Sequence, residues 1–138
     1  MAIRARYVQY YRTEVEDRAG QAYELLSHFA SHDVNLLAID TVPVGPTHAQ
    51  FTLYPAKTDK LIQAAEHLGL VLLGPNTAIL IQGDDHLSAL LDVHRKLADA
   101  GINVYAAQGV SSGEGRYGYV IHVRHDDVAR TADILNAE

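Results

Sequence analysis

The chain of 138 residues contains the same pattern twice, and this internal repeat limits the folds that it can adopt. Asn35 follows a segment with helical apolar periodicity and opens an apolar run, and Asn103, 68 positions later, has the same context. The same shift aligns four further pairs, Asp17 with Asp85, Phe29 with Leu97, Phe51 with Tyr119 and Leu53 with Ile121. A unit of about 65 residues therefore occurs twice. Because a unit of about 60 residues buries only about 60% of its unfolded surface, we expect the two units to pack on each other.

The hydrophobic pattern of the first half predicts the order strand, helix, strand, strand, helix, strand, and the second half repeats this order up to its second helix. Apolar alternation indicates strands within 7–16, 34–42, 49–53, 70–73, 77–82, 102–110 and 117–123. Helical apolar faces lie within 22–29, 61–68, 87–98 and 128–135. The order is the ferredoxin-like arrangement, so we predict an α+β fold of two βαββαβ units, each an antiparallel sheet with both helices on one face.

The pattern places a boundary between the two units at a turn formed by Gly74 and Pro75. It predicts repeats over 1–73 and 74–138, with the last strand of the second repeat missing or supplied from elsewhere. Residues 78–81 are apolar at every position, which is typical of a strand covered on both faces. Either a second chain covers the additional face, or the strand lies at the centre of a single chain.

Two short motifs resemble those of the ACT domain. The sequence Glu16-Asp17-Arg18-Ala19-Gly20-Gln21-Ala22 precedes the first helix, and Val34-Asn35-Leu36 follows it. The second half has Ala100-Gly101-Ile102-Asn103-Val104 at the equivalent place. The chain departs from the family pattern at Ala19, where a proline is usual, and at Ser88, which takes the place of Gly20. The resemblance implies a stand-alone tandem ACT protein that binds an amino acid or similar small ligand and regulates a partner enzyme.

The resemblance also implies where the ligand binds. The candidate ligand-binding residues are Asp17, Arg18, Ala19, Gly20, Asn35 and Leu36 in the first repeat and Asp85, His86 and Asn103 in the second. A helix N-terminus offers free amides to a carboxylate, and an asparagine side chain both donates and accepts hydrogen bonds. We therefore expect a ligand at an interface between units. Alternatively, Gly20 only serves the turn and Asn35 hydrogen-bonds its own backbone.

Composition excludes several other functions. The net charge of −6 argues against nucleic acid as a partner, and the absence of cysteine excludes disulfides and thiolate sites. We find no signal peptide and no membrane span, which predicts a cytoplasmic protein without a membrane partner. His28 and His32, like His122 and His125, form pairs without an evident third ligand. We therefore expect no metal and no cofactor.

The sequence has no catalytic constellation, and we predict no catalytic residue and no enzymatic activity. The favoured hypothesis is a regulatory homodimer that binds a small ligand and relays its presence to a partner enzyme. A second hypothesis is a structural or assembly protein whose ligand sites have decayed, since Ser88 replaces the glycine of the second loop. A third, less favoured one is a small enzyme on a ferredoxin-like fold.

Overall fold

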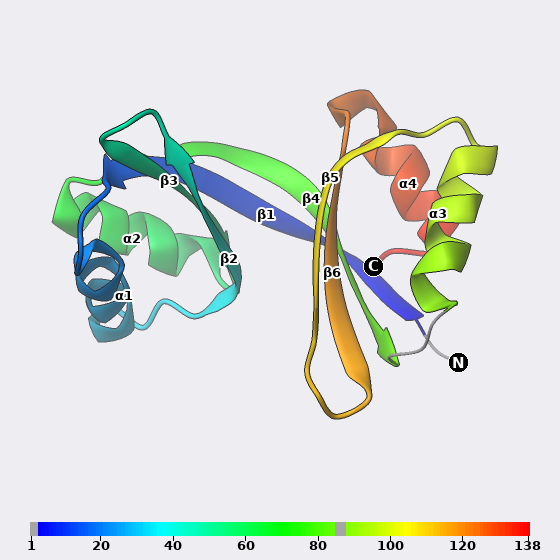
Figure 1. The fold of residues 1–138 in the computed structure, drawn as a ribbon, viewed down its shortest axis with the longest axis horizontal. Helices are drawn as coiled ribbons and strands as arrows, with labels where there is room; N and C mark the ends of the chain where they lie inside the picture. The colour runs from blue at the N-terminus through cyan, green and yellow to red at the C-terminus, as the bar shows by residue number, and fades with distance from the viewer. Residues whose placement is uncertain (1–2, 85–87) are drawn as a thin grey trace. The chain divides into compact units, whose positions relative to one another are not determined.

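The computed structural model describes residues 3–84 and 88–138, and the chain divides into two compact units (Figure 1). Unit 1 consists of Met1–Val8 and Thr77–Glu138, and unit 2 consists of Gln9–Asn76. Each unit has its own hydrophobic core between one sheet and a pair of helices. We therefore describe the units one at a time.

Unit 2 has the strand order β2-β3-β1-β4. Its elements are β1 (Ile3–Glu16), α1 (Gln21–Ser31), β2 (Leu36–Val44), β3 (His48–Pro55), α2 (Thr58–Leu68) and the start of β4 (Leu73–Asp84). β3 pairs antiparallel with both β1 and β2. Phe29 of α1 and Leu61 of α2 pack against Phe51 and Leu53 of β3, so both helices cover one face of the sheet (Figure 1).

Unit 1 has the strand order β1-β4-β6-β5. Its further elements are α3 (Ala89–Asp99), β5 (Val104–Ser111), β6 (Arg116–Val123), the 3₁₀ turn η1 (His125–Asp127) and α4 (Val128–Leu135). β6 pairs antiparallel with both β4 and β5. Ile81 and Ile121 of the sheet pack against Leu97 of α3 and Ala132 of α4, so unit 1 has the same two layers, sheet and helix pair, as unit 2.

The N-terminal part of β1 occupies the position beside β4 that the last strand of a βαββαβ unit would take. Ala5 is buried in the core of unit 1. The C-terminal residue Glu138 lies beside it: its amide donates to the carbonyl of Ala5 (3.0 Å), and its carbonyl accepts from the amide of Tyr7 (3.3 Å). The compact units therefore differ from the contiguous halves 1–73 and 74–138, because the first residues of the chain complete the sheet of unit 1.

The predicted turn at Gly74 and Pro75 is wrong, because β4 continues through both residues as a single strand. Gly74 has a φ of 145°, and the peptide to Pro75 is cis. A Cβ atom at Gly74 would lie 2.9 Å from the carbonyl oxygen of Tyr10. Glycine thus permits a close approach to β1 at this point, so the chain stays extended where sequence alone indicates a turn.

Both faces of β4 are covered within a single chain over residues 78–81. The exposed fractions are 2% for Ala78, 0% for Ile79, 6% for Leu80 and 0% for Ile81. The continuous apolar run is thus explained by a central strand, and it requires no second chain.

We predict that two buried threonines respond in opposite directions to substitution by valine. Thr13 of β1 is 2% exposed, and among the described residues its hydroxyl has no hydrogen-bond partner. The equally buried hydroxyl of Thr131 donates to the carbonyl of Asp127 at 2.7 Å. Thr13→Val should raise the free energy of unfolding by about 1 kcal/mol, and Thr131→Val should lower it by about 1 kcal/mol. Urea denaturation of both variants measures the difference, and a destabilising Thr13→Val would mean that its hydroxyl is hydrogen-bonded.

Candidate functional site

The loop between β1 and α1 holds the first group of candidate residues. Gly20 is the N-cap residue of α1 and has φ 88° and ψ −10°, a left-handed conformation that favours glycine, and no side chain caps the helix. A Cβ atom at Gly20 would meet nothing within 4 Å, so the surface above it is open. The amide of Asp17 donates to the carbonyl of Thr47 (2.9 Å), which fixes the start of the loop to the β2–β3 turn. The loop therefore presents an open, uncapped helix end.

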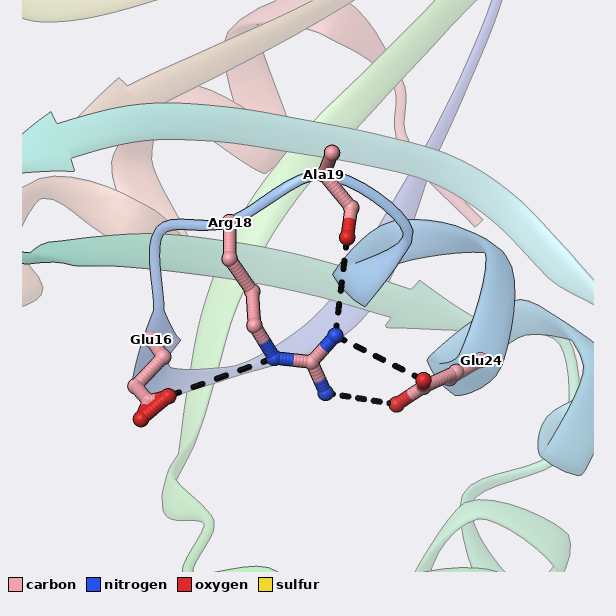
Figure 2. Close-up of polar contacts among 4 residues, drawn as sticks. All are labelled: Glu16, Arg18, Ala19 and Glu24. Atoms are coloured by element: carbon pink, nitrogen blue, oxygen red, sulfur yellow. Dashed lines mark hydrogen bonds and ion pairs between the residues drawn. The ribbon is translucent and has the colours of Figure 1, made fainter.

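Arg18 folds over this loop and is already paired (Figure 2). Its guanidinium donates to Glu24 at 2.8 and 3.5 Å and to the carbonyl of Ala19 at 3.5 Å, and it lies 3.9 Å from Glu16. The hydrogen bond and the positive charge of Arg18 lower the pKa of the Glu24 carboxyl. A ligand carboxylate would therefore have to compete with Glu24 for this guanidinium.

Asn35 lies at the opposite end of α1 from Gly20. The helix has 11 residues, which at about 1.5 Å per residue separates its two ends by about 16 Å. The carbonyl of Asn35 accepts from the amide of Ala56 (2.8 Å), whereas its exposed side chain makes no hydrogen bond within residues 3–84 and 88–138. Leu36 packs against the core of unit 2. One unit therefore does not bring Gly20 and Asn35 together.

The second repeat reproduces one end of this arrangement. The amide of Ile102 donates to the carbonyl of Leu97, as that of Val34 does to Phe29, both at 2.9 Å. Asn103 is exposed like Asn35 and follows its helix in the same way. Ser88, which precedes α3, adopts a right-handed conformation with φ −95° instead of the left-handed one of Gly20. Asp85 and His86 lie outside the described residues. At Ser88, the position equivalent to Gly20, the backbone conformation of this loop differs from that of the first loop.

The structure also brings together three histidines at the C-terminal ends of α1 and α2. The ring centroid of His32 lies 4.3 Å from that of His28 and 4.9 Å from that of His67. The Nε2 atom of His28 is buried without a hydrogen-bond partner among the described residues. Burial first, and then the neighbouring His32 and His67, lower the pKa of His28. The spacing of His28 and His32 indicates one pair, but His67 joins it only through the packing of the two helices.

Within the part of the chain that the structure describes, no group of three His, Cys, Asp or Glu residues has a geometry that could hold a metal ion.

The same residues contain no helix with the length and apolar character needed to cross a membrane.

Comparison with solved structures identifies proteins of the same fold. The protein BT0572 from Bacteroides thetaiotaomicron matches 96% of this chain and 88% of its own, with a TM-score of 0.80 and 16% sequence identity. The ligand-free regulatory subunit of aspartate kinase from Thermus thermophilus matches 98% of this chain and 93% of its own, with a TM-score of 0.67 and 16% identity. The regulatory subunit of aspartate kinase from Thermus flavus has a TM-score of 0.57 and 18% identity over 98% of this chain and 94% of its own.

No family model and no curated protein matches the sequence. The structural matches extend over nearly the whole chain, and they confirm the predicted α+β fold of two ferredoxin-like units. They also confirm, at the level of the fold, the resemblance to a tandem ACT protein.

We predict that Arg18→Gln returns the pKa of Glu24 toward its ordinary value. The hydrogen bond from Arg18 and its charge favour the ionised carboxylate, so the pKa of Glu24 in the wild type lies below that value. NMR titration of the Glu24 carboxyl from neutral to acidic pH measures both pKa values. Arg95→Gln is a matched control, because Arg95 pairs with Asp92 on α3 and does not contact Glu24. Equal pKa values in wild type and Arg18→Gln would contradict the pairing in Figure 2.

The histidine cluster should make stability fall as the solution becomes acidic. Because folding lowers the pKa of His28, its stabilising contribution is complete above the unfolded value of about 6.5 and is lost as the pH falls through the lower folded value. The melting temperature of wild type should therefore drop further between neutral and mildly acidic pH than that of His28→Gln. His48→Gln provides a control on the β2–β3 turn. Parallel profiles for wild type and His28→Gln would show that His28 has no such role.

Proposed function

We propose that this chain is a non-catalytic regulatory module that binds an amino acid or similar small ligand at an interface between ACT-like units. The observation that carries the proposal is the combination of an open helix end at Gly20, without a side-chain cap, and the exposed side chain of Asn35, which has no hydrogen-bond partner among the described residues. The likeness to regulatory subunits of aspartate kinase supports a regulatory role. We place the function of the module in control of a partner enzyme.

The proposed chemistry uses the two groups for different parts of the ligand. The amide of Gln21 already donates to the carbonyl of Arg18 (3.2 Å), and the next amides of the first turn of α1 carry a partial positive charge and donate to a carboxylate. The lack of a side chain at Gly20 lets the ligand approach them. The side chain of Asn35 donates to or accepts from the polar groups of the ligand. Asp17 and Ala19 hold the loop, and Leu36 anchors the strand that carries Asn35.

Arg18 has a conditional role in this proposal. Its guanidinium is paired with Glu24, so it contributes to carboxylate binding only when that pair opens. The pair is solvent-exposed, and exposed ion pairs of this kind contribute little to stability because water screens the two charges. A ligand carboxylate can therefore displace Glu24 at little cost.

We further propose that the protein is a homodimer. The sequence suggested a dimer from a missing strand and a doubly apolar strand, and both features are accounted for within one chain. The proposal now rests on the separation of Gly20 and Asn35 along α1, because a site that uses both groups needs a second unit. Light scattering with and without ligand tests it, and a monomer in both conditions would contradict it.

The alternative, a structural protein with decayed sites, draws support from the second repeat. Ser88 replaces the glycine and changes the backbone conformation there. Asn103 keeps its exposed position. Because the loop before α3 is changed at Ser88, we propose Asp85, His86 and Asn103 as a second ligand site that ranks below the site at Gly20 and Asn35. A protein in which both sites have decayed would bind no amino acid at all.

A screen of the twenty amino acids by thermal shift, followed by calorimetry, tests the proposed function. A ligand that binds the native state raises the melting temperature, and Asn35→Ala should weaken its binding by about tenfold or more. Asn103→Ala, the equivalent change in the other repeat, should leave the affinity of the first site within about twofold. Absence of any melting shift would favour the structural alternative, and equal affinity of wild type and Asn35→Ala would remove Asn35 from the site.

A further inference from the structure

A hollow of about 730 Å³ lies in unit 1, and none of its lining residues is among the candidate ligand-binding residues described above. Its lining residues come from the end of β4, from the β5–β6 hairpin and from the start of β1. Figure 1 shows the end of β4 beside this hairpin. Its lining includes five polar or charged residues and one glycine, Arg4, Gln82, Asp84, Glu114, Arg116 and Gly118. Its volume lies within the range of about 300–1,000 Å³ that is usual for small-molecule sites.

The hollow lies on the face of the sheet that α3 and α4 do not cover. Ala5, Ile81 and Tyr117 point into the core between the sheet and these helices. Successive residues of a strand point to opposite faces, so Arg4, Gln82 and Arg116 share the other face. Three neighbouring strands therefore present polar side chains to the same hollow.

Gly118 forms the floor of the hollow. In the register of the sheet it lies opposite Gln82 of β4 and Val110 of β5, both of which line the hollow. A Cβ atom built at Gly118 would meet nothing within 4 Å. A larger side chain at this position would therefore extend into open space without a backbone clash.

Charges of both signs line the hollow without neutralising one another. Asp84 and Arg116 are register partners on β4 and β6, yet within residues 3–84 and 88–138 they form no ion pair. The carboxylate of Glu114 likewise has no ion-pair partner there, and Arg4 forms a solvent-exposed ion pair with Glu138 at 3.8 Å, which a ligand carboxylate would have to displace. The hollow therefore offers two guanidinium groups and two carboxylates to a ligand.

We propose that this hollow binds a small zwitterion, a free amino acid or short peptide that carries one carboxylate and one ammonium group. The guanidinium groups of Arg116 and Arg4 donate hydrogen bonds to the carboxylate, for which their planar donors are suited. Asp84 and Glu114 accept the three donors of the ammonium group. A simple anion would be repelled by the two acids and a simple cation by the two arginines, so the combination selects for both charges in one molecule.

Titration followed by backbone NMR tests this site with four probes: alanine, dialanine, N-acetylalanine and alanine amide. Alanine or dialanine should shift the signals of Gln82 and Gly118 with a Kd on the order of 1 mM, because the charged groups are exposed to solvent. N-acetylalanine lacks the cation and alanine amide lacks the anion, so each should bind about tenfold more weakly or worse. Preference for dialanine over alanine would assign the hollow to short peptides, and the reverse preference to free amino acids.

Two variants keep the result attributable to the hollow. Gly118→Val should abolish the shifts by filling the floor, and Arg116→Gln should weaken binding by about tenfold. Asn35→Ala, in the other unit, should leave these shifts unchanged, so failure at the Gly20–Asn35 site and failure here are separable. Shifts that persist in Gly118→Val, or the absence of shifts at Gln82 and Gly118 with either zwitterion, would overturn the proposal.

Discussion

The structure depends on the long strand β1, which belongs to both units. Its first residues complete the sheet of unit 1, and the rest forms an inner strand of unit 2 between β3 and β4. β4 likewise begins in unit 2 and continues into unit 1. A unit of about 65 residues is marginally stable alone, and a strand that passes through two units ties the order of one to that of the other. This sharing also explains how unit 1 has four strands in the sheet although no strand follows α4 in the described residues.

The sequence predicts the parts of this fold that depend on local pattern. Periodicity at Ala22, Leu25, Leu26 and Phe29 indicates the helix observed as Gln21–Ser31, and the repeat places the Asn35 and Asn103 segments at equivalent helix ends. The course of the chain at Gly74 is not predictable in the same way, because it depends on the approach of Tyr10 from a distant part of the sequence. For the same reason, the sequence indicates that a last strand is missing but not that residues 3–8 replace it.

The candidate site shows the same division between local and distant information. The left-handed glycine at position 20 is readable from the loop sequence, because few other residues adopt that conformation. The pairing of Arg18 with Glu24 depends on how the loop turns into the helix, and the motif alone does not indicate it. His67 joins His28 and His32 only because α1 and α2 pack side by side. Motifs thus identify the groups that could meet a ligand, whereas folding decides which of them are already engaged.

Electrostatics links the two proposed sites. The chain carries a net charge of −6, so its long-range field opposes the approach of any anion. A bare carboxylate would have to overcome this repulsion before it reached the first amides of α1 or the guanidinium of Arg116. A zwitterion has no net charge and approaches without that penalty, and its ammonium group then finds acidic partners such as Asp84. In an acidic protein whose positive groups lie close to negative ones, binding of amino acids is therefore favoured over binding of simple organic anions.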